Sequence, residues 1–178
     1  MKKMGRIGWV LFLALAWAVL PLGADAKTTT ATSNGNWTDA IWDSGAPIAG
    51  DHVAIGAGVT VTLTNSTPAL GSFTNSGALV FNGDSGFGTN IALSATNCTI
   101  LSGGSITHAT NMTAIATAGV WIPSNRVWIA CSNFLLATNA SINVNGRGYR
   151  GWAPASSSPG RGPGAGQGST RGGGGGYG

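Results

Sequence analysis

Residues 51–81 form a succession of short apolar or alternating runs divided by turn residues. Each run is only a few residues long, and Gly, Asn, Ser or Pro separates it from the next. Runs of this kind predict β-strands joined by tight turns. In residues 59–63 aliphatic side chains alternate with threonine, so one face of that strand should be apolar and the other polar. No helical period lies nearby to supply a crossover helix, so the stretch favours a stack of strand-and-turn coils.

The same alternation of short runs and turns continues beyond this stretch. The runs are alike in pattern and not in residue identity, so the sequence does not indicate a regular pentapeptide or calcium-binding nonapeptide repeat. We therefore predict an all-β chain, a parallel β-helix or β-solenoid of short strands whose rungs occupy residues 51–145. The later rungs are expected at residues 70–74, 78–81, 91–95, 98–101, 105–107, 112–115, 120–122, 127–130, 134–137 and 141–144.

Residues 1–26 have the three parts of a secretory signal peptide. Basic residues precede an apolar segment at residues 7–22, and alanines on either side of Asp25 give the small-x-small pattern of a cleavage site. We predict a signal helix of bacterial type, cleavage after Ala26, and a secreted or cell-surface protein. A retained membrane anchor is the alternative, but the uninterrupted apolar run is shorter than the roughly 20 residues that a membrane-spanning helix needs.

Without residues 1–26 the chain keeps six basic residues and four aspartates, a net charge of about +2. This charge is too small to indicate nucleic-acid binding. No residue between Asp84 and Arg126 is Asp, Glu, Lys or Arg, so this long stretch is a poor place for acid/base catalysis. The sequence therefore predicts no catalytic residue, no cofactor and no metal site. Contact with a membrane is expected only through the signal peptide during export.

Paired tryptophans, Trp37 and Trp42, a Gly-x-Pro turn at residues 45–47, and Asp51 precede two alternating runs. With these features residues 36–63 resemble the first rung of exported bacterial β-solenoid surface proteins of the autotransporter-like and adhesin-like kind. The resemblance implies that Trp37 and Trp42 close the open end of the solenoid as an N-terminal cap, with Asp51 opening the first strand. Such a cap covers apolar surface and unpaired strand edges. Residues 27–50 are then a lead-in and cap.

Residues 146–178 differ in composition from the rest, because glycine fills 14 of these positions. Together with the run before it, this tract resembles a second feature of the same surface proteins, in which a strand leads into glycine-rich loops. We expect an irregular loop or tail here. The glycine run at the end also suggests that the chain is a fragment of a longer protein.

The two cysteines and three of the tryptophans are candidate site residues. Export would allow a disulfide between Cys98 and Cys131, while two unpaired buried thiols are the alternative. Trp121, Trp128 and Trp152 could stack on sugar rings if they were exposed. Trp121 and Trp128 each lie in a Val-Trp-Ile run, however, and this placement favours a buried aromatic column shared by two stacked rungs.

Asp39, Asp43, Asp51 and His52 form the one acidic cluster of the sequence. Such a cluster could bind Ca²⁺ through oxygen ligands or supply paired carboxylates for sugar chemistry. Aspartate before a turn or strand also accepts hydrogen bonds from nearby backbone N–H groups, and we favour this structural role.

These features together predict an exported, non-enzymatic surface or extracellular protein, an adhesin-like scaffold. Its expected partner is a polysaccharide or other cell-surface material, and no nucleic acid. Two alternatives stay open. The chain could be the N-terminal part of a polysaccharide-active enzyme, a lyase or glycosidase with its catalytic residues beyond Gly178, or it could be a carbohydrate-binding module.

Overall fold

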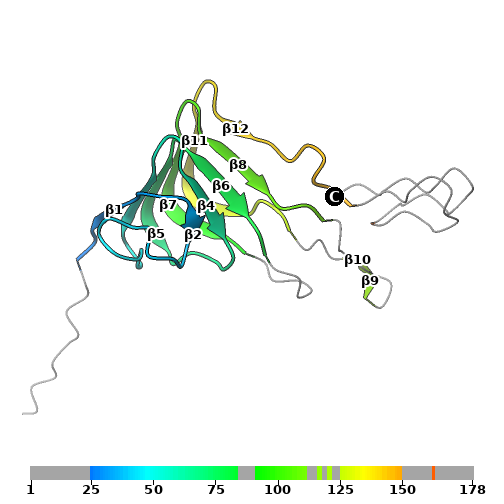
Figure 1. Cartoon of the computed structure of the whole chain (residues 1–178), viewed down its shortest axis with the longest axis horizontal. Helices are drawn as coiled ribbons and strands as arrows, with labels where there is room; N and C mark the ends of the chain where they lie inside the picture. The colour runs from blue at the N-terminus through cyan, green and yellow to red at the C-terminus, as the bar shows by residue number, and fades with distance from the viewer. Residues whose placement is uncertain are drawn as a thin grey trace, which may run out of the picture.

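The computed structural model describes residues 25–83, 91–111, 116–117, 120–121, 125–149 and 162. All regular secondary structure in this part of the chain is β-strand, so the prediction of an all-β protein is confirmed (Figure 1). None of the described residues belongs to a helix that could cross a membrane. The expected signal helix and most of the glycine-rich tract lie outside the described residues.

Ten of the strands form two five-stranded parallel sheets. The first sheet contains, in order, β1 (Thr28–Ala31), β3 (His52–Ile55), β5 (Leu70–Asn75), β7 (Leu93–Ile100) and β11 (Ile129–Leu136). The second contains β2 (Gly35–Asn36), β4 (Thr60–Leu63), β6 (Ala78–Phe81), β8 (Ser105–His108) and β12 (Ser141–Ile142). A separate antiparallel pair consists of β9 (Ala116–Thr117) and β10 (Val120–Trp121). Each strand of the first sheet is followed along the chain by a strand of the second, apart from this inserted pair.

The register of the parallel strands aligns apolar side chains into columns that form the core. In the first sheet Val53 pairs with Phe73, which pairs with Cys98, and all three are buried. The second sheet aligns Val61, Leu79 and Ile106 in the same way. Alternate residues of these strands point outward and are partly exposed, as the period of a β-strand requires. Burying one such apolar side chain stabilises the fold by about 1.5–3 kcal/mol.

Two glycines allow the turns between the sheets to stack closely. A Cβ atom on Gly77, between β5 and β6, would lie 2.3 Å from the carbonyl oxygens of both Gly56 and Val59. A Cβ atom on Gly104, just before β8, would lie 2.3 Å from the carbonyl oxygen of Asn75. The backbone of the preceding turn therefore occupies the space that any larger residue needs.

The structure differs from the sequence-based prediction in the length of β7 and β11. Each is one strand of eight residues where the sequence predicts two shorter runs. The polar residues Thr96 and Asn97 in β7 are both exposed, and the pairing of β7 with β11 continues in the same register on either side of Thr96. Asn97 pairs with Asn133 of β11, and the Asn133 Nδ2 atom donates to Asn97 Oδ1 at 2.8 Å. Side-chain stacking thus replaces the turns that these polar residues suggest.

Residues 27–50 contribute more than a lead-in. They contain β1 and β2, which pair with β3 and β4 and so begin both sheets. The Thr/Ser composition of this segment hides the strand signal, because Thr29 takes the inward position that valine and phenylalanine occupy in the next two strands.

Candidate functional site

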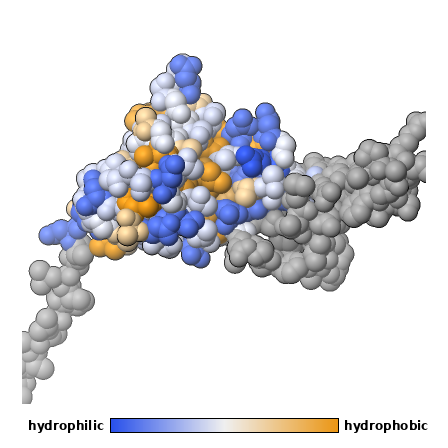
Figure 2. Space-filling model, viewed as in Figure 1, coloured by the Kyte–Doolittle hydropathy of each residue, from blue (hydrophilic) through white to orange (hydrophobic). Residues whose placement is uncertain are grey.

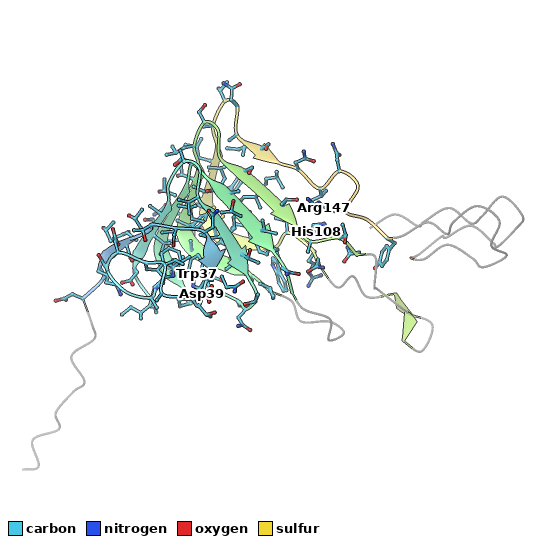
Figure 3. The ribbon with its side chains drawn as sticks, viewed as in Figure 1. Trp37, Asp39, His108 and Arg147 are labelled. Carbon is cyan, nitrogen blue, oxygen red and sulfur yellow. The ribbon has the colours of Figure 1, made fainter. Side chains whose placement is uncertain are left out.

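Trp37 and Trp42 lie together at the end of the sheets where β1 and β2 begin. Both are buried, their ring centroids are 4.8 Å apart in an edge-on arrangement, and the Trp42 indole N–H donates to the Trp37 carbonyl oxygen at 2.9 Å. The Trp37 ring also lies 6.5 Å from the ring of Phe73 in the core. Figure 3 shows Trp37 beside Asp39 at this end of the molecule. Both rings belong to the hydrophobic core, and the capping role stays a prediction.

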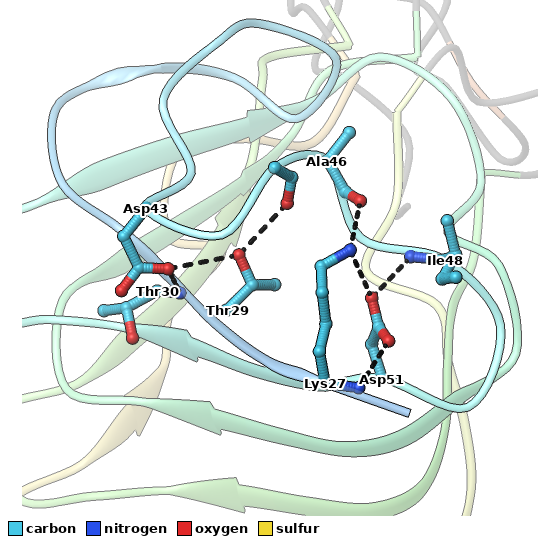
Figure 4. A network of polar contacts seen from close by, with 8 residues as sticks. Lys27, Thr29, Thr30, Asp43, Ala46, Ile48 and Asp51 are labelled. Carbon is cyan, nitrogen blue, oxygen red and sulfur yellow. Dashed lines mark hydrogen bonds and ion pairs between the residues drawn. The ribbon is translucent and has the colours of Figure 1, made fainter. Parts of the chain in front are cut away.

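Asp51 is the most buried ionisable side chain at the same end, with 0% of its surface exposed. Its Oδ1 atom accepts from the Lys27 backbone N–H at 3.0 Å, and its Oδ2 atom accepts from the Ile48 N–H at 2.8 Å and lies 3.2 Å from Lys27 Nζ (Figure 4). Burial alone would raise the pKa of Asp51, but these hydrogen bonds and the Lys27 charge outweigh it and lower the pKa. The carboxylate is therefore ionised at neutral pH and ties the start of β1 to the loop before β3.

The other members of the acidic cluster contact different parts of the backbone. Asp39 Oδ2 accepts from the Asn36 N–H at 2.7 Å, and Asp43 Oδ1 accepts from the Thr30 N–H at 2.8 Å. The hydrogen bond from Thr30 is the main cause of the lowered pKa of Asp43. The Nδ1 atom of His52 lies 2.8 Å from Ser72 Oγ on the outer face. Among the described residues no three His, Cys, Asp or Glu side chains come together as a metal site.

Of the two alternatives for Cys98 and Cys131, the structure has the unpaired thiols, because both cysteines are free. Cys98 pairs with Phe134, three residues beyond Cys131 on the neighbouring strand, so the two cysteines are offset by about 10 Å along the sheet. A disulfide requires Cα atoms within about 7 Å. Burial, with a smaller contribution from Cys131, raises the pKa of Cys98 to about 12, so this thiol is protonated at neutral pH.

The candidate sugar-stacking tryptophans differ in where the structure places them. Trp128 is 40% exposed, and the Arg126 guanidinium lies 4.6 Å from the centre of its ring. Trp121 is on β10, in the separate antiparallel pair, whereas Trp128 directly precedes β11. The predicted column of stacked Val-Trp-Ile runs is therefore wrong, since the two runs belong to different sheets. Trp152 lies outside the described residues.

A cavity of about 490 Å³ lies at the other end of the sheets, where β8 and β12 end. Its position follows from a change in one core column: Leu63 and Phe81 are succeeded in register by His108. His108 is buried, and its Nδ1 atom lies 2.6 Å from the Ala109 carbonyl oxygen. A carbonyl can only accept, so Nδ1 is the donor in this contact. The cavity is lined by His108, Asn111, Asn125, Arg126, Val127, Ile142, Val144 and Gly148.

Two buried asparagines form the polar wall of this cavity. Asn111 Nδ2 donates to the Asn125 carbonyl oxygen at 2.9 Å, and the Asn125 N–H donates to Asn111 Oδ1 at 2.6 Å. The Asn125 Nδ2 atom donates to the Thr110 carbonyl oxygen, while Asn125 Oδ1 is buried without a hydrogen-bond partner. An unsatisfied buried acceptor costs about 1–3 kcal/mol, so Asn125 is held here at some expense in stability.

The last strands of the two sheets, β11 and β12, and the residues beside them leave apolar side chains exposed at this end. Phe134 and Leu136 occupy the columns of Cys98 and Ile100, yet they are 44% and 43% exposed. Ile142 and Val144 of the second sheet side are exposed to a similar degree. On the face that Figure 2 shows, several hydrophobic patches lie among the polar side chains. Among the described residues, β11 and the segment at β12 therefore expose large apolar side chains, whereas Trp37 and Trp42 are buried where the sheets begin.

Sequence reasoning did not identify the cavity at His108, Asn111 and Asn125. The two asparagines are 14 residues apart in the chain, so no local pattern brings them together. The one available signal was a histidine at the inward position of a strand whose neighbouring strands place Leu63 and Phe81 there. Figure 3 shows that Arg147 lies near His108 at this end.

The comparisons with known proteins give one match. Residues 41–122 match the family model of the G8 domain. This segment includes Trp42, Asp51 and His108 and ends before β11. Searches of curated proteins and of solved structures found no match. G8 domains typically occur in extracellular proteins, so the similarity over residues 41–122 favours an extracellular protein.

Proposed function

We propose that the chain is an exported β-solenoid of the cell surface or extracellular space that acts as a non-enzymatic, adhesin-like scaffold. The observation that carries this proposal is the continuous parallel register of the two sheets. A first-sheet strand and the second-sheet strand that follows it make up one coil, and each coil stacks on the one before. Stacked coils bury a continuous core and present long outer faces for binding.

One outer face has the chemistry of an adhesive surface. The outward column of the first sheet consists of polar side chains from all five strands: Thr28, His52, Ser72, Asn97 and Asn133. His52 and Ser72 contact each other, as do Asn97 and Asn133, so neighbouring members hold each other in place. A fixed row of hydroxyl, amide and imidazole groups suits the hydroxyl groups of a polysaccharide or other cell-surface material.

Export is supported by the sequence of residues 1–26 and by the similarity to G8 domains. The alanines around Asp25 place the cleavage after Ala26, and Ala26 is exposed outside β1. A bacterial signal peptidase would then release a protein that begins at Lys27.

The scaffold role is favoured over the lyase or glycosidase alternative by what the carboxylates contact. A glycosidase needs two carboxyl groups facing one sugar. In the described residues Asp39, Asp43 and Asp51 each accept backbone hydrogen bonds in separate turns. These contacts use the carboxylates structurally.

Carbohydrate binding in the cavity at the β8 and β12 end is a second candidate function. It is favoured by two buried polar side chains, His108 and Asn111, which line the cavity together with Arg126. A volume of about 490 Å³ is within the range of small-ligand sites. The apolar wall of Val127, Ile142 and Val144 would contact the carbon face of a sugar ring.

We expect residues 27–178 to bind members of a polysaccharide panel without releasing reducing or unsaturated ends. If the cavity is the binding site, His108→Leu should weaken binding about tenfold, the loss of one hydrogen bond to a ligand. This variant should still fold, because leucine restores the side chain that Leu63 provides in the same column. Affinity is measured by titration calorimetry and turnover by reducing-end and absorbance assays.

His52→Gln is the matched control, since His52 lies on the outer face and not in the cavity. If His52→Gln weakens binding and His108→Leu does not, the polar outer column is the binding surface and the cavity is not. Release of sugar ends by the wild-type chain would contradict the scaffold proposal.

A further inference from the structure

We propose that cleavage after Ala26 creates an α-ammonium group on Lys27 that the buried Asp51 carboxylate binds, so that processing completes the N-terminal end of the fold. The inference rests on the proposed export. It assigns to Asp51 a partner that the precursor chain lacks, and it makes the mature protein more stable than the precursor.

The geometry already places the nitrogen of Lys27 on Asp51. The Lys27 backbone N–H donates to Asp51 Oδ1 at 3.0 Å, while the Lys27 Nζ atom lies 3.2 Å from Oδ2 and donates to the Ala46 carbonyl oxygen at 3.1 Å (Figure 4). The Lys27 carbonyl oxygen accepts from the His52 N–H at 2.8 Å and fixes this residue against β3. Lys27 is therefore held from both sides of its own backbone.

Cleavage changes the charge of this nitrogen without moving it. In the precursor it belongs to the peptide bond with Ala26 and is neutral. Hydrolysis adds water across that bond: the oxygen joins the new carboxylate of Ala26, which leaves with residues 1–26, and the nitrogen becomes an amine. An α-amino group has a pKa of about 7.7–8.0 in unfolded chains, so it is protonated near neutral pH.

The buried carboxylate benefits from a second positive partner. Asp51 is fully buried, whereas the Lys27 side chain that neutralises it is 32% exposed. After cleavage each carboxylate oxygen has a cationic donor, Lys27 Nζ at Oδ2 and the α-ammonium at Oδ1. Charge-assisted hydrogen bonds are roughly twice as strong as neutral ones. The hydrogen bond from the Lys27 nitrogen to Asp51 Oδ1, which an amide N–H makes in the precursor, is therefore the one that becomes stronger.

The scissile bond is accessible, and the neighbouring charged groups are engaged elsewhere. Asp25 and Ala26 are exposed, and β1 begins only at Thr28. The other titratable side chains on the adjoining elements are Asp43, which contacts Thr29 and Thr30, and His52, which contacts Ser72. Lys27 and Asp51 are the charged side chains with a contact at this position.

The test compares residues 27–178 with the same chain retaining Ala26, both purified and melted at pH 6. We expect the chain that begins at Lys27 to melt about 4 °C higher. The difference in melting temperature should disappear above about pH 9. The α-amino group loses its proton there, and with it the positive charge that the Asp51 carboxylate binds. Equal melting temperatures at pH 6, or a gap that persists unchanged at pH 10, would overturn the inference.

Two variants separate the α-ammonium from the other contacts of Asp51. Lys27→Gln in both chains removes Nζ and keeps the α-amine, so the gap should remain. Asp51→Asn in both chains should abolish the gap, and if that variant does not fold, the pH series and the Lys27→Gln pair still decide the question. Cleavage at another position in the exported protein would overturn this inference and leave the proposed export standing, whereas a cytoplasmic protein that keeps residues 1–26 would contradict the export itself.

Discussion

Replacing Phe73 by alanine should lower the free energy of unfolding by about 3–5 kcal/mol. Phe73 is fully buried in the middle strand of the first sheet, between Val53 and Cys98 in register, and its ring centroid lies 6.5 Å from that of Trp37. Removing the Phe73 ring leaves a cavity that the neighbouring strands cannot close, because hydrogen bonds within the sheet hold their backbones in place. Since domains are stable by only about 5–15 kcal/mol, urea unfolding should show a large loss.

Thr74→Ala is the control for this prediction. Thr74 is the next residue of the same strand and faces outward, so its change should cost about 0.5 kcal/mol or less. If Phe73→Ala and Thr74→Ala had equal midpoints in urea, the inward column of the first sheet would not be a core.

Gly77→Ala should destabilise the protein by about 3 kcal/mol. The new methyl group would lie 2.3 Å from the carbonyl oxygens of Gly56 and Val59, and neither backbone group can move without breaking the stacking of the turns. The measurement is again urea unfolding, with circular dichroism to check that β-structure is retained.

Gly56→Ala is the matched comparison, in the adjacent turn. A Cβ atom on Gly56 meets no atom within 4 Å, and its backbone does not have a positive φ. This change should be neutral or stabilise by about 0.5 kcal/mol through the unfolded state. Equal effects of the two substitutions would contradict the close stacking of successive turns.

The sequence predicts the strands best where apolar and polar residues alternate. Residues 59–63 alternate plainly, and β4 lies there. The interior polar residues could not be predicted in this way. Asn75 is fully buried because its side chain donates to the Ser105 carbonyl oxygen, 30 residues away, and accepts from the Gly77 N–H. Such a role depends on the backbone of another coil, which a local pattern does not contain.

The candidate sites also differ in whether they depend on local sequence or on contacts that the fold creates. The pairing of Trp37 with Trp42 is local, five residues apart, and could be expected from sequence. The sequence could not decide between a Cys98–Cys131 disulfide and two free thiols, because the distance between the cysteines depends on the register of two strands. Asn125 belongs to a site only because the fold brings it against Asn111.

The most direct test of the proposed function is to express the whole 178-residue sequence in a bacterial host and to determine where the protein accumulates and where it begins. We expect the protein outside the cytoplasm, with an intact mass and N-terminal sequence that start at Lys27. A cytoplasmic protein that keeps residues 1–26 would contradict export, and with it the extracellular scaffold.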